Sequence, residues 1–452
     1  MYEIDSDFDV IDKQNIFYSN FRKLNPQFRI DSSNVASSSE EIEYFEDFYS
    51  NLTPGMHEFL PDDFNFKRAD VFSMQQIFAD NWEAFCVDPY CSSFASDNAK
   101  QQVDKMLKCQ DPSHGFALYQ CSHCNKLFAV PFSCKSRICN SCAITYQKKL
   151  ANNINHKLIN CKHRHIVFTI PQQLRHYFLD FPQLLNCLFT AAEQSIAYFF
   201  HKRAPRKNLV PGSVLVLHTF GRDLKWNPHI HSLVTEGASS NLSNAPANDT
   251  WVNITHFDYE FFRKSFRKTL LDNLKTALKD LLVPFEFKKF KALVNFFYKN
   301  YKQGFYVRAK PFDGGSSSRA VSYLLRYFNR PPMAQSRILF YDGKFVVFYY
   351  QRHEDNMFVI EKIPVFEFIA RIIIHLPQKH FKMIRYTGIY SSHKVALFDK
   401  LILKVKMSLF SLHKSLLYWA NSIEVSFHYD PLLCPFCGSR ISFSNIFVVN
   451  SS

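Results

Sequence analysis

Two histidines separated by one residue are the first candidates for chemistry in the sequence. His229 and His231 stand in the run WNPHIHSLV, residues 226–234, whose residue types predict a β-strand. Side chains alternate between the two faces of a strand, so both imidazoles point the same way and could bind one metal ion. With 18 histidines in the chain, roughly one such pair is expected by chance, and HRH at 163–165 is a second. The pair therefore indicates a site only together with other residues.

Two tyrosines could supply a nucleophile. Tyr323 and Tyr327 stand four residues apart in SYLLRYFNRPP, on one face of a helix predicted over 319–330. A phenolate can attack a phosphodiester when a metal ion polarises the phosphate, and the phosphate would then stay bonded to the tyrosine as a 5′-phosphotyrosine. Arg326 and Arg330 lie on neighbouring turns and could bind adjacent phosphates. The alternative is an aromatic stripe that packs on the core.

Two pairs of cysteines form the most specific pattern in the chain. Cys121 and Cys124 are separated by two residues, as are Cys139 and Cys142. This spacing is typical of a tetrahedral zinc site with four thiolate ligands, which is structural because no position is left for water. We therefore predict one structural zinc ion bound by these four cysteines.

Three further cysteines leave alternatives open. Cys134 lies between the two pairs, and Cys434 and Cys437 form a late pair in CPFCG. Cys134 could be a spare thiol. It could also join Cys434, Cys437 and another ligand in a second site that ties the two ends of the chain together.

The predicted elements place the histidines on a hairpin inside a mixed α and β chain. Apolar residues recur at helical spacing over several segments, and β-branched and aromatic runs predict the strands. Tight turns and prolines separate the elements, with a helix break at Pro284 and a hairpin turn at Asp342-Gly343. The predicted helices cover 66–108, 143–159, 172–203, 257–303 and 319–330, and the predicted strands cover 164–171, 212–221, 229–237 and the hairpin 337–352.

The composition favours a globular protein that binds a polyanion. Residues 1–63 carry 14 acidic and 4 basic residues, so the other 389 residues hold 50 basic and 26 acidic ones, a net charge of +24. A basic body attracts nucleic acid by counterion release, and the acidic lead segment could be a mobile arm that covers that surface. The alternative is a generally basic, solvated protein. The sequence contains no run of apolar residues long enough to span a membrane and no secretory signal, so we expect a cytoplasmic protein.

Six blocks in order resemble one known family. They are the cysteine cluster, HRHIVFTIP, HTFGRDLKWNPHIHSLVTEG, YLLRYFNRPP, LPQKHFKMIRYTGIYS and DPLLCPFCG, spread over residues 90–440. Together they resemble the rolling-circle insertion-sequence transposases of the HUH two-tyrosine class, which have an N-terminal zinc-binding domain. The resemblance implies metal ligands at His229 and His231 and nucleophiles at Tyr323 and Tyr327. Ile138 stands where many relatives have histidine.

The fold and cofactors that the resemblance implies are as follows. The fold class is α+β, in which a palm-like (RRM-like) antiparallel sheet with flanking helices forms the HUH nuclease core. Imidazole and oxygen ligands suit Mg²⁺ or Mn²⁺ as the catalytic ion, beside the structural Zn²⁺. Two residues could be the third protein ligand, His218 on the adjoining strand or His165 on the first strand, and either could instead be bonded within the fold.

We therefore expect a DNA transposase that nicks and joins single-stranded DNA at its element's ends and acts near the bacterial nucleoid. A plasmid or phage replication initiator or a relaxase would use the same chemistry. A noncatalytic zinc-containing DNA-binding protein is the alternative of a different class. We expect an acidic, flexible lead over 1–63, a helical zinc-binding domain over 64–155, the nuclease domain over 156–352 and a mostly helical C-terminal region over 353–452.

Overall fold

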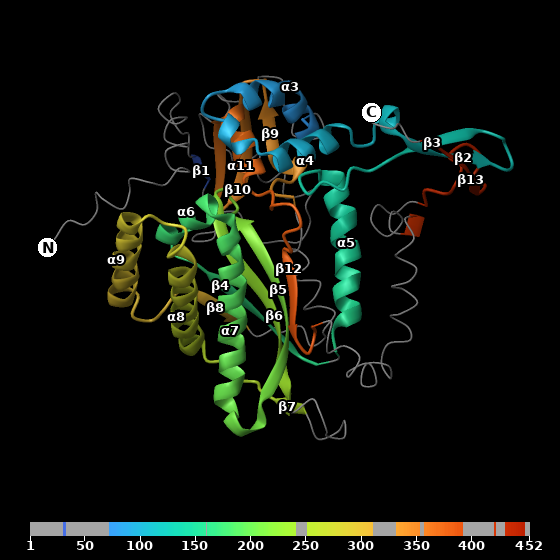
Figure 1. Cartoon of the computed structure of the whole chain (residues 1–452). Helices are drawn as coiled ribbons and strands as arrows, with labels where there is room; N and C mark the ends of the chain where they lie inside the picture. Colours follow the sequence, from blue (N-terminus) through green and yellow to red (C-terminus); the bar gives the residue numbers. More distant parts are fainter. Residues whose placement is uncertain are drawn as a thin grey trace.

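The computed structural model has a mixed α+β fold with antiparallel sheets and several helices (Figure 1). It describes residues 30–32, 72–159, 161–240, 251–310, 331–352, 357–391, 420–421 and 430–447. Within these residues the strands form three sheets, which we call the central sheet, the upper sheet and the ribbon.

The central sheet is antiparallel and has strand β6 in its middle. Its order is β12, β5, β6, β4, β8, and β7 pairs with the far end of β6. The predicted hairpin is confirmed, because β5 and β6 pair along most of their length and are joined by a tight turn at residues 221–225. The strand bounds are β4 His163–Thr169, β5 Leu209–Phe220, β6 Trp226–Ser240, β7 Trp251–Asn253, β8 Val307–Lys310 and β12 Ile384–Gly388.

Helices cover both faces of the central sheet because its strands are apolar on both sides. Ile166, Leu217 and Ile230 point to one face and pack into a large core with helices α6 to α9. On the opposite face, helix α5 packs against Val214 and Leu233, the face to which His229 and His231 also point. The helix bounds are α5 Asn140–Lys157, α6 Gln172–Asp180, α7 Leu185–Arg203, α8 Tyr259–Leu278 and α9 Pro284–Asn300. The break expected at Pro284 is thus the first residue of α9.

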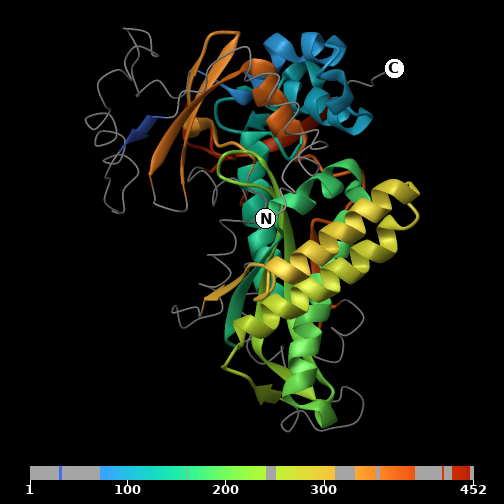
Figure 2. The same ribbon diagram turned by 90° about the vertical axis from the view of Figure 1, so that its left-hand side faces the viewer.

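The upper sheet has the order β1, β11, β10, β9 and packs against helices α3, α4 and α11 (Figure 2). One buried cluster joins residues 74–142 to residues 333–373, so two segments far apart in the sequence share a core. Strand β1 comes from the acidic lead segment and lies along the edge of β11. The bounds are β1 Ile30–Ser32, α3 Met74–Val87, α4 Asp97–Leu107, β9 Ile338–Tyr341, β10 Phe345–Gln351, β11 Phe358–Pro364 and α11 Val365–Ile373.

The ribbon is a small antiparallel sheet that extends to one side of the molecule (Figure 1). Strands β2 (Phe116–Cys121) and β3 (Leu127–Pro131) form a hairpin, and β13 (Ile441–Phe447) pairs with β2. The segment predicted as a helical zinc-binding domain therefore includes a hairpin. The region predicted as mostly helical, 353–452, contributes three strands beside α11 in its described part, because β11, β12 and β13 each complete a sheet started elsewhere in the chain.

Short 3-10 turns connect the longer elements. They are η3 Ser92–Phe94, η4 Pro112–His114, η5 Pro182–Leu184, η6 Pro205–Lys207 and η7 Gln335–Arg337. Among the helices of the described residues, none is both long enough and apolar enough to cross a bilayer.

Candidate metal centres

Three imidazoles meet on one face of the central sheet. His229 and His231 are neighbours on that face of β6, and His218 lies directly opposite His229 on β5. One ring nitrogen from each of the three lies within 4.8 Å of the others. The Nε2 atoms of His229 and His231 are 3.1 Å apart. Of the two residues considered as a third ligand, the structure brings His218 into this group.

Hydrogen bonds orient the imidazoles of His229 and His231. Nδ1 of His229 donates to the backbone carbonyl of Asn227 over 2.6 Å, so Nε2 of the neutral ring keeps its lone pair. Nδ1 of His231 lies 2.9 Å from Nε2 of His165, whose ring is stacked almost parallel to that of His231. Such partners orient metal-binding imidazoles in known metal sites. His165 thus contacts the Nδ1 side of His231, whereas the Nε2 side of His231 faces His229.

Burial keeps the imidazoles of His231 and His165 neutral. Burial first, and then the nearby rings of His218 and His229, hold the pKa of His231 well below its usual range. Burial, followed by the charge of Arg308, lowers the pKa of His165 to about 4. A neutral imidazole is the form that binds a metal ion, so His231 is in the binding form at neutral pH. Two imidazole nitrogens bonded to one ion at about 2.1 Å would lie about 3 Å apart, which fits the distance observed here.

Arg308 is a basic residue of this face that the sequence did not single out. It is exposed on β8 and pairs with Val167 of β4, whose side chain shares the face of His165 and His231. Its position at the sheet edge could bring a guanidinium to a phosphate near the histidines. Nothing in its local sequence marks it, because only the strand pairing shows which face it shares.

The other predicted residues of the nuclease site lie outside the described residues. These are the tyrosines Tyr323 and Tyr327 and the arginines Arg326 and Arg330.

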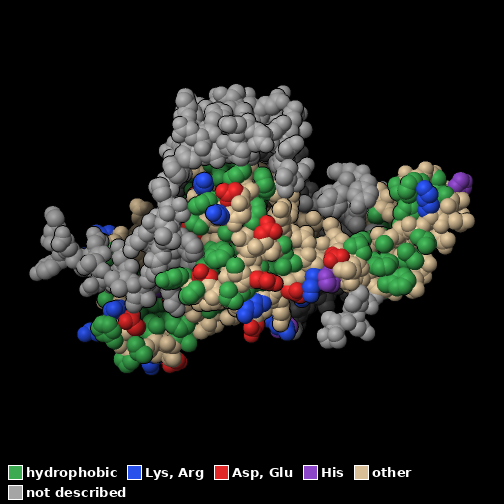
Figure 3. Space-filling view, turned by 90° about the horizontal axis from the view of Figure 1, so that it is seen from above, with side chains coloured by type: hydrophobic (Ala, Val, Ile, Leu, Met, Phe, Trp, Pro, Cys, Tyr) green, Lys and Arg blue, Asp and Glu red, His purple; other side chains and the backbone are tan. Residues whose placement is uncertain are grey.

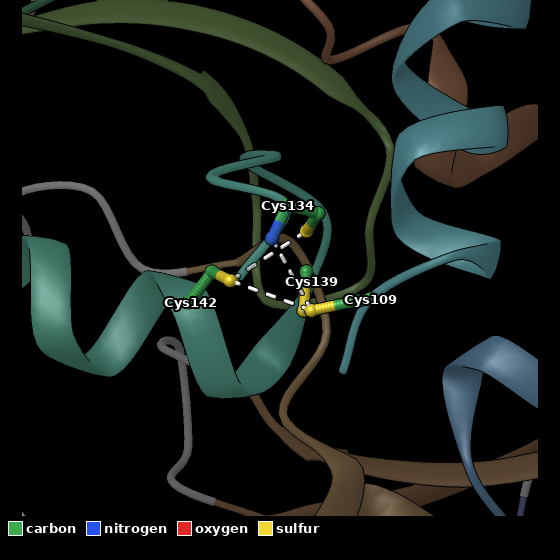
Figure 4. Close-up of side chains that lie close together, drawn as sticks. All are labelled: Cys109, Cys134, Cys139 and Cys142. Carbon is green, nitrogen blue, oxygen red and sulfur yellow. Dashed lines mark hydrogen bonds between the residues drawn. The ribbon is translucent and has the colours of Figure 1, made fainter. Parts of the chain in front are cut away.

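The first cysteine cluster is formed by Cys109, Cys134, Cys139 and Cys142 (Figure 4). The distances between sulfur atoms are 3.6 Å for Cys109 and Cys142, 3.5 Å for Cys134 and Cys142, and 3.7 Å for Cys139 and Cys109. A disulfide would need about 2.05 Å, whereas four thiolates bound to zinc at about 2.3 Å lie about 3.8 Å apart. The four sulfur atoms therefore fit a zinc ion.

The surroundings of Cys142 favour a thiolate at this member of the cluster. Cys139 caps the N-terminus of α5 and Cys142 lies in its first turn, where the helix dipole stabilises negative charge. Hydrogen bonds from the neighbouring thiols, that of Cys109 first, lower the pKa of Cys142. The backbone N–H of Cys134 also donates to the sulfur of Cys109. The cluster is thus suited to a divalent cation.

The second cluster is formed by Cys121, Cys124, Cys434 and Cys437 in the ribbon. The sulfur of Cys121 lies 3.5 Å from that of Cys437, and the sulfur of Cys124 lies 3.6 Å from that of Cys434. A hydrogen bond from the backbone N–H of Ser439 is the main cause that lowers the pKa of Cys437 to about 6. This cluster joins parts of the chain more than 300 residues apart.

The structure corrects the predicted grouping of the cysteines. The pairs Cys121/Cys124 and Cys139/Cys142 belong to different clusters, so they do not form one site together. The reason is strand β3, whose five residues lead the chain roughly 15 Å away between the two pairs. Cys134 is a member of the first cluster and does not join the late pair.

Cys109 is the cluster member that the sequence analysis missed. It has no Cys-x2-Cys partner and follows directly after the segment of α4. The number of ligands could have indicated it. If Cys121 and Cys124 belong to another site, then Cys134, Cys139 and Cys142 make only three of the four ligands that zinc needs, and a further cysteine must supply the fourth.

Comparisons with known proteins give two family matches and two similar transposases. Residues 212–396 match a family described as "Putative transposase", and residues 77–170 match a family described as "Transposase zinc-binding domain". The chain is 27% identical over 359 residues to the transposase for insertion sequence element IS801 of Pseudomonas savastanoi pv. phaseolicola. The aligned residues cover 76% of this chain and 83% of that protein. It is 25% identical over 294 residues to the putative transposase y4qJ of Sinorhizobium fredii, with 62% and 71% covered. No solved structure gives a significant match.

Proposed function

Because the chain belongs to the IS91/IS801 family of insertion-sequence transposases, we propose that it cuts and joins single-stranded DNA through a covalent phosphotyrosine bond. The nucleophiles are Tyr323 and Tyr327. The observation that carries the proposal is the convergence of His218, His229 and His231 on the middle strand and its neighbour, where Nε2 of His229 faces Nε2 of His231 at 3.1 Å. The central sheet then serves as the palm-like core of an HUH nuclease.

The described ends of the tyrosine segment support this assignment. Lys310 ends β8, which is two strands from β6 and so about 10 Å from it. At the other end, Met333 belongs to the same buried cluster as Leu224, which lies in the turn that joins the strands of His218 and His229. Twelve residues lie between Lys310 and Tyr323, a length of chain that can reach well beyond about 10 Å.

The reaction follows from these groups. The three imidazoles, together with oxygen atoms of water and phosphate, would hold Mg²⁺ or Mn²⁺, and this ion would polarise the scissile phosphate and stabilise the charge that develops on it. The tyrosine oxygen attacks the phosphorus, the bond from phosphorus to the 3′-oxygen breaks, and the proton of the phenol ends on the leaving 3′-hydroxyl through solvent. The 5′-phosphate stays on the tyrosine until a 3′-hydroxyl of another strand attacks it and releases the phenol. Arg308 would bind a phosphate of the same strand.

The cysteine clusters have a structural role in this proposal and do not take part in the reaction. Zinc in the first cluster stabilises the segment around α5 and does not react, since four thiolates leave no open position. Together with the basic surface, this part of the chain would position the DNA.

Incubation with labelled single-stranded oligonucleotides and Mn²⁺ tests the proposal. The oligonucleotides carry the two ends of the element, and we expect a protein–DNA adduct that survives denaturation. The change Tyr323→Phe together with Tyr327→Phe should abolish it, as should His229→Ala with His231→Ala. Tyr298→Phe, on the exposed side of α9, is the matched control and should leave the adduct unchanged.

Two outcomes would contradict the proposal. An adduct that persists in the double tyrosine variant would assign the nucleophile to another residue. DNA binding with no adduct, in a protein that keeps its zinc, would favour a noncatalytic DNA-binding protein.

A further inference from the structure

The ribbon contains two turns with the same pattern of backbone hydrogen bonds. In the first turn, the N–H of Cys121 donates to the carbonyl of Lys126 and the N–H of Asn125 donates back to the carbonyl of Cys121, each over 3.0 Å. In the second turn, the N–H of Cys434 donates to the carbonyl of Ser439 and the N–H of Gly438 donates back to the carbonyl of Cys434, each over 2.8 Å. Each turn therefore holds its two cysteines in the same local geometry.

The residue after the second cysteine has the same backbone conformation in both turns. Asn125 has φ 58° and Gly438 has φ 69°, both in the left-handed region that favours asparagine and glycine. This conformation turns the chain back under the sulfur atoms, so that backbone N–H groups point at them. The N–H of Lys126 bonds the sulfur of Cys124 in this way, and the N–H of Ser439 bonds the sulfur of Cys437.

The two turns face each other through their cysteines. All four sulfur atoms lie within 4.8 Å of one another, and the pairs across the interface are 3.5 and 3.6 Å apart. These distances are too long for disulfides, which need about 2.05 Å, and are close to the distance of about 3.8 Å for tetrahedral zinc. Four soft thiolates in this arrangement select zinc among the common divalent cations.

The ribbon has too small a core to be held by hydrophobic burial alone. Its buried cluster contains four residues, Tyr119, Cys121, Cys434 and Ile441. Its larger apolar side chains lie outside, with exposed fractions of 59% for Leu127, 67% for Phe436 and 55% for Phe443. Figure 3 shows such side chains gathered at the right-hand end of the molecule. Sheets of this size need a metal or disulfides to be stable.

We infer that Cys121, Cys124, Cys434 and Cys437 bind a second structural zinc ion, separate from that of the first cluster, which fastens β13 to the β2–β3 hairpin. The segment that matches the zinc-binding family, residues 77–170, therefore supplies only half of the ligands of this site. The other half arrives with residues 434–437, more than 300 residues later. The ribbon can form only after that segment has been synthesised, and a chain that lacks it has an incomplete zinc-binding region.

Measurement of zinc in the purified full chain tests this inference. We expect about two zinc ions per chain in the unchanged protein and about one after Cys434→Ser with Cys437→Ser. The change Cys134→Ser with Cys139→Ser should also leave about one, because it removes the other ion. The controls Cys86→Ser and Cys187→Ser lie outside both clusters and should retain both ions.

Combined changes distinguish the grouping of the ligands. Cys121→Ser with Cys437→Ser should lose only one ion, as either change does alone, because both residues serve the same site. Cys139→Ser with Cys437→Ser should lose both ions. If Cys437→Ser leaves the zinc content unchanged, or if Cys121→Ser and Cys437→Ser together remove two ions, the inference is wrong.

Hydrogen exchange separates loss of the site from general misfolding. In the Cys434→Ser, Cys437→Ser variant we expect faster exchange of the backbone amides of β2 and β3, while the amides of α3 and α7 remain protected. Protection of β2 and β3 equal to that of the unchanged protein would overturn the inference. Because zinc content and exchange do not depend on DNA cleavage, their outcome is independent of the phosphotyrosine proposal.

Discussion

The imidazoles of His229 and His231 on the central sheet are each oriented by one hydrogen bond. His229 is oriented by a backbone carbonyl, whereas His231 is oriented by the ring of His165. The second arrangement depends on a side chain and can therefore be changed by mutation. We assign His165 as a positioning residue for His231.

We predict that His165→Ala weakens Mn²⁺ binding about 10- to 100-fold, because the Nδ1 proton of His231 loses its acceptor and the ring can rotate. His165→Gln should recover much of the affinity, since its amide oxygen can accept the same hydrogen bond. Isothermal titration calorimetry measures both values. His163→Gln changes a buried histidine of the same strand that bonds Tyr390 instead, and it should leave the affinity unchanged. Equal affinity in His165→Ala and the unchanged protein would remove this role.

His375, a buried histidine outside the histidine group, makes the free energy of unfolding depend on pH. Nε2 of His375 donates to the carbonyl of Leu224 over 2.9 Å, and burial lowers the pKa of His375 to about 3. The unfolded chain has a pKa of about 6.5 at this residue, so between these values it binds more protons than the folded protein. The stabilising contribution of neutral His375 to the free energy of unfolding is therefore fully present above about pH 6.5 and is lost as the pH falls towards 3.

We predict that His375→Gln flattens this dependence, because glutamine can donate to the same carbonyl and does not titrate. The free energy of unfolding should fall less steeply between about pH 6.5 and pH 4, by up to about 1.4 kcal/mol per pH unit. Urea unfolding at several pH values measures the slope. An identical slope in both proteins would show that His375 does not carry the effect.

At the scale of elements, the turn between β5 and β6 joins the central sheet to the upper sheet. Leu224 in this turn has φ 63° and is fully buried in the core of the upper sheet. The carbonyl of its neighbour Asp223 accepts a hydrogen bond from Arg371 of α11. Arg371 is itself buried and pairs with Glu361 and Glu367 over 2.8 and 2.5 Å. The turn that links the strands of His218 and His229 is thus held by a buried charge network.

We predict that Arg371→Met lowers the free energy of unfolding by about 3–5 kcal/mol, because two buried carboxylates lose their cation. Adding Glu361→Gln and Glu367→Gln should recover much of the loss, since the remaining groups are then uncharged. Chemical denaturation of the single and triple variants tests this. If the triple variant is no more stable than Arg371→Met, packing and not charge explains the loss.

At the scale of the whole molecule, charge is divided between the acidic lead and a body with a net charge of +24. Binding of DNA to such a body releases counterions, so affinity falls as salt rises. For single strands the slope of log K against log salt is about −0.7 per phosphate contact, which gives roughly a hundredfold loss between about 50 and 200 mM salt for about five contacts.

We predict that Arg308→Gln makes this slope shallower by about 0.7, because one phosphate contact near the histidines is lost. Fluorescence anisotropy with a labelled single strand at several salt concentrations measures it. Lys275→Gln, near the end of α8, carries the same charge change away from the histidine face and is the matched control. Equal slopes for the two variants would place the DNA elsewhere on the surface.

The sequence alone determined the features that depend on near neighbours in the chain. The hairpin of β5 and β6, the helices α5 and α7, and the shared face of His229 and His231 follow from periodicity over a few residues, and the structure confirms them. The resemblance to the transposase family rests on the same local motifs, and the comparisons bear it out. The roles of Tyr323 and Tyr327 stay predictions.

Only the tertiary structure decided which distant residues meet. It brought His218 to the histidine pair, added Cys109 to the first cluster and joined Cys121 and Cys124 to Cys434 and Cys437. A thiol or an imidazole has the same local pattern whichever partner it finds, because a metal ion requires only that its ligands lie within a few ångströms. That proximity is produced by strand pairing across long separations in the chain, such as β13 on β2, which spacing along the sequence does not encode.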